Sequence, residues 1–270
     1  MPFLEHDGIR FHYDITGDGP ALVFSHGLTG SIENARELIG TVPGYRQVFW
    51  DARGHGKTVP AGPASGFAFG VFAQDLAALL DHAGIQRAVV GGISMGAAIS
   101  TRFAIRYPDR VRALILVRPA WMTEPLPEGL ELMPEVAKSM DRFGPEEGCE
   151  VFVRSAAYQS LLARQPETAK VLREQYFAES AFERRGRLTG IPGDAPIRRW
   201  SEVENLRIPA LVIGNEPDYV HPISFARTWA ERLPGGGFVE VPAKATAFEP
   251  HAIAVRDHVS RFLQSLEESQ

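Results

Sequence analysis

The stretch GGISMG at residues 91–96 decides the fold of this chain. It follows an apolar run at residues 87–90 and precedes a segment of helical character at residues 97–104. This order predicts a β-strand, a turn too tight for ordinary side chains and a helix, with Ser94 at the apex. Glycines at positions 92 and 96 avoid the collision that Cβ atoms would make where the helix folds back onto the strand. A serine on such a turn is placed for nucleophilic attack if a base reaches its hydroxyl.

Short apolar runs alternate with helix-period segments along most of the 270 residues. An N-terminal hairpin around the turn Asp7-Gly8 is expected to precede them. Continuous apolar character, rather than alternation, suits parallel strands that are buried on both faces. We therefore predict an α/β fold, with a mostly parallel central β-sheet flanked by helices. The predicted buried strands cover residues 21–24, 47–50, 88–90, 113–117, 210–213 and 238–241.

One interval breaks this alternation. From about Pro119 to Pro196 no buried strand is evident, and helical stretches dominate. A chain of this length lies near the upper limit for one continuous core, which favours a large domain with an insertion. We predict a core domain formed by residues 1–119 and 197–270, and a helical cap subdomain at residues 120–196.

Composition and charge limit the classes of partner. Hydrophobic residues make up 44% and charged residues 23%, which is ordinary for a soluble globular protein. The net charge of −5 and the lack of a basic stripe argue against a nucleic-acid partner. The single cysteine, Cys149, is expected to be a structural thiol. Without a secretory signal or an apolar run of about 18 residues, we expect a cytoplasmic location and no membrane partner. The expected partner is a small-molecule substrate, and a homodimer stays open.

Ligands of an open α/β sheet bind beyond the carboxyl ends of its strands, so the site residues are expected directly after the strands. His26-Gly27-Leu28 follows the first parallel strand. The backbone N–H groups of Leu28 and Met95 are candidates to hold a developing oxyanion. His26 is expected to order this loop. The segment DARGHGKT at residues 51–58 imitates a phosphate-binding loop, but it has an aspartate where that loop needs its first glycine. We interpret it as a hydrogen-bonded turn that braces the site.

Three side chains are candidates for contact with a substrate. They are His26, Arg118 at the end of its strand, and Trp121 at the start of the predicted cap. Arg118 suits either a substrate carboxylate or a nearby acidic side chain. Trp121 suits either the roof of an apolar pocket or the packing of cap helices.

An acidic loop follows the predicted strand at residues 210–213. Asp218 in this loop is expected to accept the Nδ1–H of a histidine and to fix its tautomer. Glu216 is the alternative, and Pro217 between the two restricts the loop so that only one points inward. We favour Asp218. His221 is expected to pack within the loop, next to Pro222.

The base is expected after the last predicted strand. Residues 243–251 contain one histidine, His251, which lies in the first turn of the last helix if Pro250 takes the first helical position. A helix N-terminus favours the neutral imidazole that a general base needs. The alternative is an ordinary surface or capping histidine. His258, two turns further, is expected to flank the core. The predicted catalytic residues are thus Ser94, Asp218 and His251.

Taken together, these residues resemble the α/β-hydrolase superfamily, as a serine hydrolase with a helical cap domain. The resemblance covers nearly the whole chain, and the order Ser94, Asp218, His251 is the order which that family uses. One departure concerns the base. Family members usually carry the histidine soon after the last strand, where this chain has no histidine at residues 244–246.

The resemblance implies hydrolysis of a carboxylic ester or lactone through an acyl-enzyme, with neither a metal nor an organic cofactor. The same triad serves carbon–carbon bond hydrolysis of a β-diketone-like substrate, which is the first alternative. The second is a non-catalytic ligand-binding protein, because a histidine is missing at residues 244–246. Epoxide hydrolase and dehalogenase activities are disfavoured, since those relatives have an aspartate where Ser94 stands.

Overall fold

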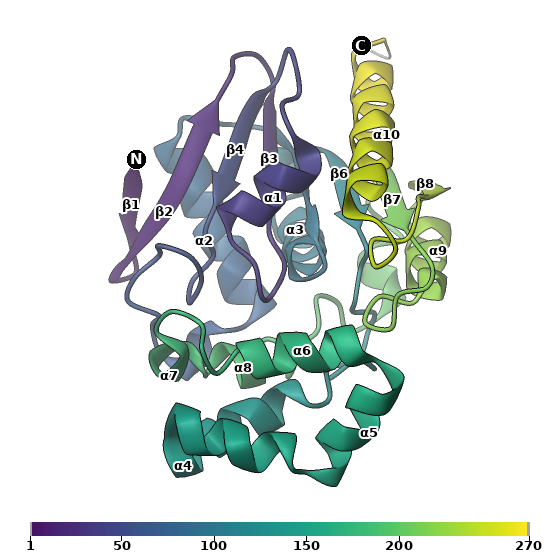
Figure 1. Ribbon diagram of the computed structural model, residues 1–270. Helices are drawn as coiled ribbons and strands as arrows, with labels where there is room; N and C mark the ends of the chain where they lie inside the picture. The colour runs from purple at the N-terminus through teal and green to yellow at the C-terminus, as the bar shows by residue number, and fades with distance from the viewer. Residues whose placement is uncertain (1, 269–270) are drawn as a thin grey trace.

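A single eight-stranded sheet organises the computed structural model, which describes residues 2–268 (Figure 1). The strand order is β1-β2-β4-β3-β5-β6-β7-β8, and every neighbouring pair from β4 to β8 is parallel. Only β1 and β2 run antiparallel to their neighbours. The predicted α/β fold with a mostly parallel sheet is thus confirmed. The strands are β1 (Phe3–His6), β2 (Ile9–Thr16), β3 (Ala21–Ser25), β4 (Arg46–Trp50), β5 (Ala88–Ile93), β6 (Val111–Val117), β7 (Pro209–Gly214) and β8 (Gly235–Glu240).

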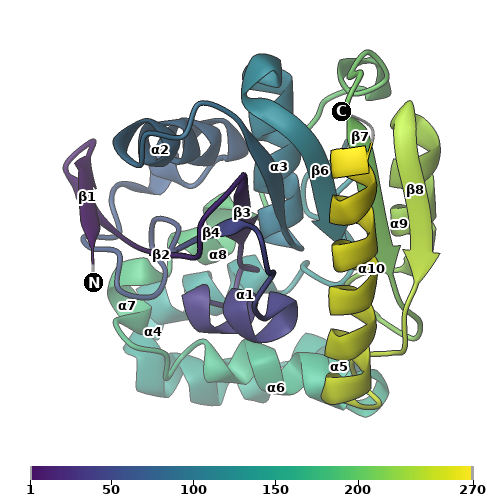
Figure 2. The same cartoon turned by 90° about the horizontal axis from the view of Figure 1, so that it is seen from above.

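Helices cover both faces of the sheet, and each face has its own apolar core. Residues alternate between the faces along each strand, so Val23 packs toward one core while Leu22 and Phe24 pack toward the other. Figure 2 shows α1 and α10 on one side of the sheet and α2 and α3 on the other. The helices of these layers are α1 (Ile32–Ile39), α2 (Phe69–His82), α3 (Met95–Arg106), α9 (Ile223–Arg232) and α10 (Phe248–Glu268).

Strand β8 begins three residues earlier than the predicted run at residues 238–241. Glycines at positions 235–237 pair with β7 although glycine has little preference for strands. A Cβ atom on Gly235 would lie 2.5 Å from the carbonyl oxygen of Ile208, and one on Gly236 would overlap the carbonyl oxygen of Ala230. Close backbone packing therefore requires glycine here, and a pattern based on apolar side chains does not detect it.

Helices fill the chain between β6 and β7, and Figure 1 shows them packed below the sheet as a separate layer. Side chains of this layer reach the loop that follows β4: the Arg184 guanidinium donates to the carbonyl oxygen of Gly56 at 2.9 Å, and that of Arg187 to Gly54 at 3.1 Å. The layer therefore covers the carboxyl ends of the parallel strands. The limits of the core and cap domains stay a prediction. These helices are α4 (Met133–Val153), α5 (Ala156–Arg164), α6 (Pro166–Glu174), α7 (Ala181–Arg184) and α8 (Arg187–Gly190).

Two further observations concern membrane-spanning helices and the cysteine Cys149. Within residues 2–268, no helix combines the length and the apolar character needed to cross a membrane. Cys149 is buried on α4, and burial raises the pKa of its thiol. A buried thiol of raised pKa is inert at neutral pH, which agrees with a structural role.

Candidate active site

Ser94 lies at the tip of a strained turn between β5 and α3. Its backbone adopts φ 54° and ψ −109°, a conformation of positive φ that non-glycine residues rarely take. A Cβ atom on Gly92 would lie 2.5 Å from the carbonyl carbon of Gly96, and one on Gly96 would overlap the carbonyl oxygen of Ser25. The predicted collision between helix and strand is thus found at Gly92, whereas Gly96 is required by the close approach of the neighbouring strand β3. This packing fixes Ser94 in the turn, directly before the first residue of α3.

A chain of hydrogen bonds connects Ser94 to a carboxylate. The Nε2 atom of His221 lies 3.0 Å from Ser94 Oγ, and its Nδ1 atom lies 2.9 Å from Asp218 Oδ1. The backbone N–H of His221 also donates to Asp218 Oδ1, at 3.1 Å. This second bond closes a short turn that fixes the imidazole between the carboxylate and the hydroxyl. Ser94 and Asp218 are thus brought together, and the residue between them is His221.

His251 does not lie where the sequence analysis expects it. Its Nδ1 atom is 2.9 Å from the carbonyl oxygen of Pro242, and its Nε2 atom has no hydrogen-bond partner within residues 2–268. The side chain is fully buried at the start of α10, which packs on the sheet through Ala252 and Val255. The expected contact with Ser94 is therefore wrong, because the bond to Pro242 and this packing hold the ring within the core.

The sequence analysis expects His221 only to pack within its loop, whereas its Nε2 atom contacts Ser94 Oγ. The sequence signal for its role is the three-residue spacing from Asp218, which lets one loop carry both acid and imidazole. This spacing lies after β7, whereas the base is expected after the last strand. Glu216, the alternative acid, is exposed to solvent, whereas Asp218 is 12% exposed and faces His221.

The charges around the site favour an ionised Asp218 and a neutral His221. Burial opposes ionisation of Asp218, but His221 and the Arg118 guanidinium hold the pKa of this carboxyl well below its usual range. Burial, together with the positive charges of Arg118 and Lys244, lowers the pKa of His221 below 6.5 although Asp218 acts in the opposite direction. At neutral pH the imidazole is therefore neutral and its Nε2 lone pair can accept the Ser94 proton.

Arg118 pairs with the acid. Its Nη1 atom lies 3.1 Å from Asp218 Oδ2, so the two carboxylate oxygens bind different partners. The side chain is buried and directly follows β6, with φ 47°. Of the two roles open from the sequence, the structure thus gives the pairing with a nearby acid.

The loop with the predicted oxyanion donor runs beside Ser94. A Cβ atom on Gly27 would lie 3.7 Å from Ser94 Cβ, so the backbone that leads into Leu28 approaches the serine closely. Met95 is the first residue of α3, and its N–H has no acceptor inside the helix. Both amides therefore belong to segments that flank Ser94.

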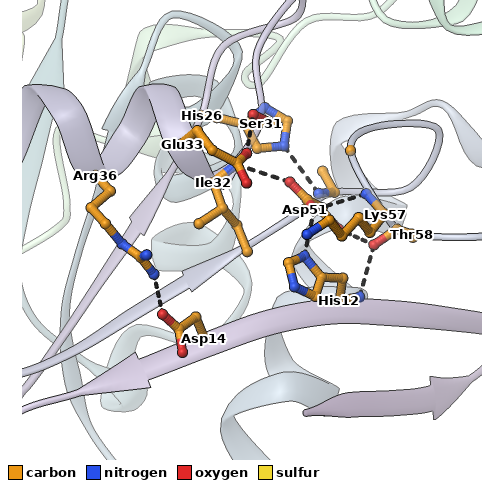
Figure 3. Close-up of polar contacts among 12 residues, drawn as sticks. His12, Asp14, His26, Ser31, Ile32, Glu33, Arg36, Asp51, Lys57 and Thr58 are labelled. Carbon is orange, nitrogen blue, oxygen red and sulfur yellow. Dashed lines mark hydrogen bonds and ion pairs between the residues drawn. The ribbon is translucent and has the colours of Figure 1, made fainter. Parts of the chain in front are cut away.

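Asp51 anchors the brace predicted at residues 51–58 (Figure 3). Its carboxylate lies 2.7 Å from His12 Nδ1 and accepts the backbone N–H of Ile32 and of Lys57, each at 2.9 Å. The Thr58 hydroxyl donates to the backbone carbonyl of Asp51 at 2.6 Å. Burial opposes ionisation of this carboxylate, but these hydrogen bonds and His26 keep its pKa below the usual value. The network joins β2, the start of α1 and the loop after β4 into one unit.

Two neighbouring histidines, His26 and His55, connect this brace to the loop beside Ser94; their ring centroids lie 4.8 Å apart. His26 Nε2 accepts the backbone N–H of Ala52 at 3.1 Å, so its Nδ1 carries the proton and donates to the carbonyl oxygen of Gly27 at 2.7 Å. His55 Nε2 lies 2.7 Å from the carbonyl oxygen of Leu28. Both rings are fully buried. Because both nitrogens of His26 bind backbone, the structure does not place His26 for contact with a substrate.

Trp121 is also withdrawn from solvent. It is 1% exposed, and its ring packs edge-on against Phe69 with centroids 5.3 Å apart. Its carbonyl oxygen accepts from the Trp229 indole at 2.7 Å. Of the two expected roles, packing therefore describes this residue.

A cavity of about 230 Å³ lies between the helices that follow β6 and the loop with the acid and histidine. Leu132, Leu161 and Tyr219 are among the residues that line it, while Ser94 is not part of its wall. A Cβ atom on Gly129 would lie 2.9 Å from Val220 Cα, so this layer packs directly against the loop. Within residues 2–268, no group of three or more histidine, cysteine, aspartate or glutamate side chains is arranged to hold a metal ion.

Comparison with known proteins identifies the family to which this fold belongs. Residues 20–252 match the family model of the alpha/beta hydrolase fold. A Bacillus subtilis protein with the provisional name 2-succinyl-6-hydroxy-2,4-cyclohexadiene-1-carboxylate synthase is 31% identical over 224 residues, which are 78% of this chain and 79% of the relative. A 2-hydroxy-6-oxononadienedioate/2-hydroxy-6-oxononatrienedioate hydrolase from Burkholderia vietnamiensis is 30% identical over 228 residues, or 80% of this chain and 77% of the relative.

The fold is also similar to that of a solved structure. The enol-lactonase from Burkholderia xenovorans LB400 is 23% identical, and the similarity has a TM-score of 0.75 and covers 97% of this chain and 100% of that one. The sequence match over most of the chain and the eight-stranded sheet agree with each other. The chain therefore belongs to the alpha/beta hydrolase fold family.

Proposed function

We propose that this chain is a serine hydrolase that cleaves a carboxylic ester or lactone through an acyl-enzyme. The observation that supports the proposal is the hydrogen-bond chain from Ser94 through His221 to Asp218, with distances of 3.0 and 2.9 Å. A nucleophile, a neutral imidazole and an ionised carboxylate in this order are the groups that acyl transfer requires.

In the first half of the reaction, Ser94 Oγ attacks the carbonyl carbon while His221 Nε2 takes the hydroxyl proton. The carbonyl oxygen becomes negative and accepts hydrogen bonds from the N–H groups of Leu28 and Met95. The tetrahedral intermediate then expels the alkoxide, which takes the proton from His221. The acyl group stays on Ser94.

Water completes the cycle. His221 removes a proton from a water molecule, which attacks the acyl carbon, and the proton returns to Ser94 Oγ as the carboxylic acid leaves. Asp218 accepts the Nδ1–H throughout and stabilises the imidazolium that forms in each half-reaction. In a lactone the leaving alcohol stays attached to the acyl chain, so the same steps apply.

A second candidate is carbon–carbon bond hydrolysis of a β-diketone-like substrate. It is favoured by the 30% identical relative, whose name describes a hydrolase of an oxo-dienedioate. The two reactions share the site but differ in the leaving group, which is an oxygen in one and a carbon in the other. The non-catalytic alternative loses its motive, because His221 lies beside Ser94 although residues 244–246 lack histidine.

A labelling experiment with substrate profiling tests the proposal. A fluorophosphonate probe is expected to form one adduct, which peptide mass spectrometry locates on Ser94. In parallel, short aryl esters, simple lactones and a β-diketone are assayed at equal concentrations. Turnover of the esters or lactones, with the diketone inert, agrees with the proposal. Cleavage of the diketone alone would favour the second candidate, and a protein inert to the probe and to all three substrates would contradict both.

The pH dependence of the reaction follows from the environment of His221. Because burial and nearby positive charges lower the pKa of His221 below 6.5, the free enzyme loses its base only as the pH falls through that value. We expect kcat/KM to be flat around pH 7 and to reach half its maximum below pH 6.5. A buffer series with a short aryl ester measures this limb. A midpoint clearly above pH 6.5 would be inconsistent with the charges at this site.

A further inference from the structure

Three buried side chains that follow the neighbouring strands β6, β7 and β8 have polar atoms without partners. We call Arg118, Asn215 and His251 the rear polar cluster; they are 9%, 1% and 0% exposed. Within residues 2–268, no hydrogen bond reaches Arg118 Nε, either polar atom of the Asn215 amide, or His251 Nε2. Buried polar atoms are almost always paired, so four such atoms in one part of the fold require an explanation.

The sheet brings Arg118 and Asn215 to the same edge. Arg118 directly follows β6 and Asn215 directly follows the neighbouring strand β7. The backbone N–H of Arg118 donates to the carbonyl oxygen of Ile213 at 2.7 Å, and Val117 pairs with Ile213, so Arg118 lies across from Gly214, next to Asn215. Both side chains therefore start from adjacent points at the carboxyl ends of the strands.

His251 lies on α10, which follows β8, the strand next to β7. The backbone N–H of Val241 donates to the carbonyl oxygen of Gly214 at 3.0 Å, so the chain beyond β8 stays beside the end of β7. The next residue is Pro242, whose carbonyl oxygen lies 2.9 Å from His251 Nδ1. The charge of Arg118 also acts on His251, whose pKa is lowered by burial first and by Arg118 and Lys244 in addition.

The unpartnered atoms define what they can bind. The carbonyl oxygen of Pro242 only accepts, so His251 Nδ1 carries the proton and Nε2 presents a lone pair. Arg118 Nε donates, and the Asn215 amide offers one donor group and one acceptor. Two donors and two acceptors match the hydrogen-bonding capacity of water. An anion would face the two acceptors, and a cation would face the Arg118 guanidinium.

We propose that the rear polar cluster holds buried water, and that this water fixes Arg118 against Asp218 Oδ2. Asn215 and His251 are then positioning residues, which act on the acid through Arg118. The effect on catalysis rests on the proposed function, whereas the water site itself does not. His251, the base predicted from the sequence, would thus help to position Asp218 through Arg118.

This arrangement has a consequence for the pH profile. The charged groups that act on His221 are Asp218, Arg118 and Lys244. Burial lowers the pKa of His251 below 6.5, so at neutral pH its replacement removes no charge, and we expect its effect on His221 to pass through the position of Arg118. A less firmly held Arg118 lowers the pKa of His221 less strongly. The acid limb of kcat/KM is then expected to move to higher pH.

A crystal structure of the wild-type protein tests the water site without reference to activity. We expect ordered water within hydrogen-bond distance of Arg118 Nε and His251 Nε2. A dry site, an ion in place of water, or side chains that point away from one another would overturn the proposal. The result stands even if the protein proves to have another activity.

Kinetics of variants test the positioning role. His251→Leu is expected to move the acid limb up by about half a pH unit, whereas His251→Gln, which keeps an acceptor, shifts it less. Arg118→Gln is expected to move the limb in the same direction and further. If His251 acts through Arg118, adding His251→Leu to Arg118→Gln gives no further shift. His258→Leu on the same helix is the control for a loss of histidine from α10.

The outcomes separate the two proposals. An unshifted limb in a folded His251→Leu variant, or the same shift with and without Arg118, would refute the positioning role. Should His251→Leu fail to fold, His251→Gln and the wild-type crystal structure still decide. Failure of the proposed function shows differently, as activity that survives the loss of Ser94.

Discussion

His221→Ala is expected to lower kcat for ester hydrolysis by about 10⁴- to 10⁶-fold, with little change in the fold. The His221 side chain contacts both Ser94 Oγ and Asp218 Oδ1, so its removal leaves the hydroxyl without a proton acceptor and the carboxylate without its imidazole partner. No other imidazole among residues 2–268 is hydrogen-bonded to Ser94. Steady-state kinetics with a short aryl ester measure the loss, and thermal unfolding verifies that the variant is folded.

His251→Gln is the matched control for this prediction. Its ring binds the carbonyl oxygen of Pro242 and takes no part in the chain from Ser94 to Asp218. We expect kcat to stay within about tenfold of the wild type, since a positioning residue acts only indirectly. If His251→Gln lost activity as completely as His221→Ala, or if only His251→Gln did, the assignment of His221 as the base would be refuted.

The nucleophile is the part of the site that local sequence describes best. Two glycines flank Ser94 at fixed spacing, an apolar strand precedes it and a helix follows, and all of these lie within about twenty residues. A Cβ atom on Gly96 would collide with Ser25 on β3, but the collision at Gly92 is with Gly96, which the strand–turn–helix order already brings close. Such short-range geometry can be predicted because few arrangements of the backbone satisfy it.

The base was not predictable in the same way. His221 follows β7 and His251 follows β8, so either position in the sequence is compatible with an imidazole near Ser94. The choice between them depends on the paths of two loops. One is closed by the backbone N–H of His221 on Asp218, and the other is held by Val241 and Pro242 at the ends of β7 and β8. The contacts that hold His251 arise only after the strands have assembled, and the distance from His221 to Ser94 depends on the same assembly.

The brace around Asp51 lies between these extremes. The sequence predicts a hydrogen-bonded turn at residues 51–58, and the structure has one (Figure 3). The partners from outside the segment, His12 and Ile32, are 39 and 19 residues away along the chain, and no local pattern points to them. Turn formation is thus readable from sequence, whereas the partners that a turn acquires depend on strand order.

Ser94→Ala is expected to reduce kcat by about 10⁴- to 10⁶-fold and to abolish the fluorophosphonate adduct. The substitution removes the atom that forms the acyl-enzyme, while His221, Asp218 and both predicted oxyanion donors stay in place. Alanine has no larger side chain than serine, so the turn keeps its strained backbone and the variant is expected to unfold at a similar temperature. The hydrolysis rate and the labelled peptide are the two measurements.

Ser100→Ala is the control on the same helix. The Ser100 hydroxyl is buried and donates to the carbonyl oxygen of Gly96 at 2.8 Å, so it shares the environment of α3 without reaching the imidazole. Its loss is expected to change kcat by less than about tenfold, because a single neutral hydrogen bond contributes only about 1 kcal/mol. Wild-type turnover by Ser94→Ala would show that the chemistry uses another group, and the acyl-enzyme mechanism would then be wrong even though the fold is right.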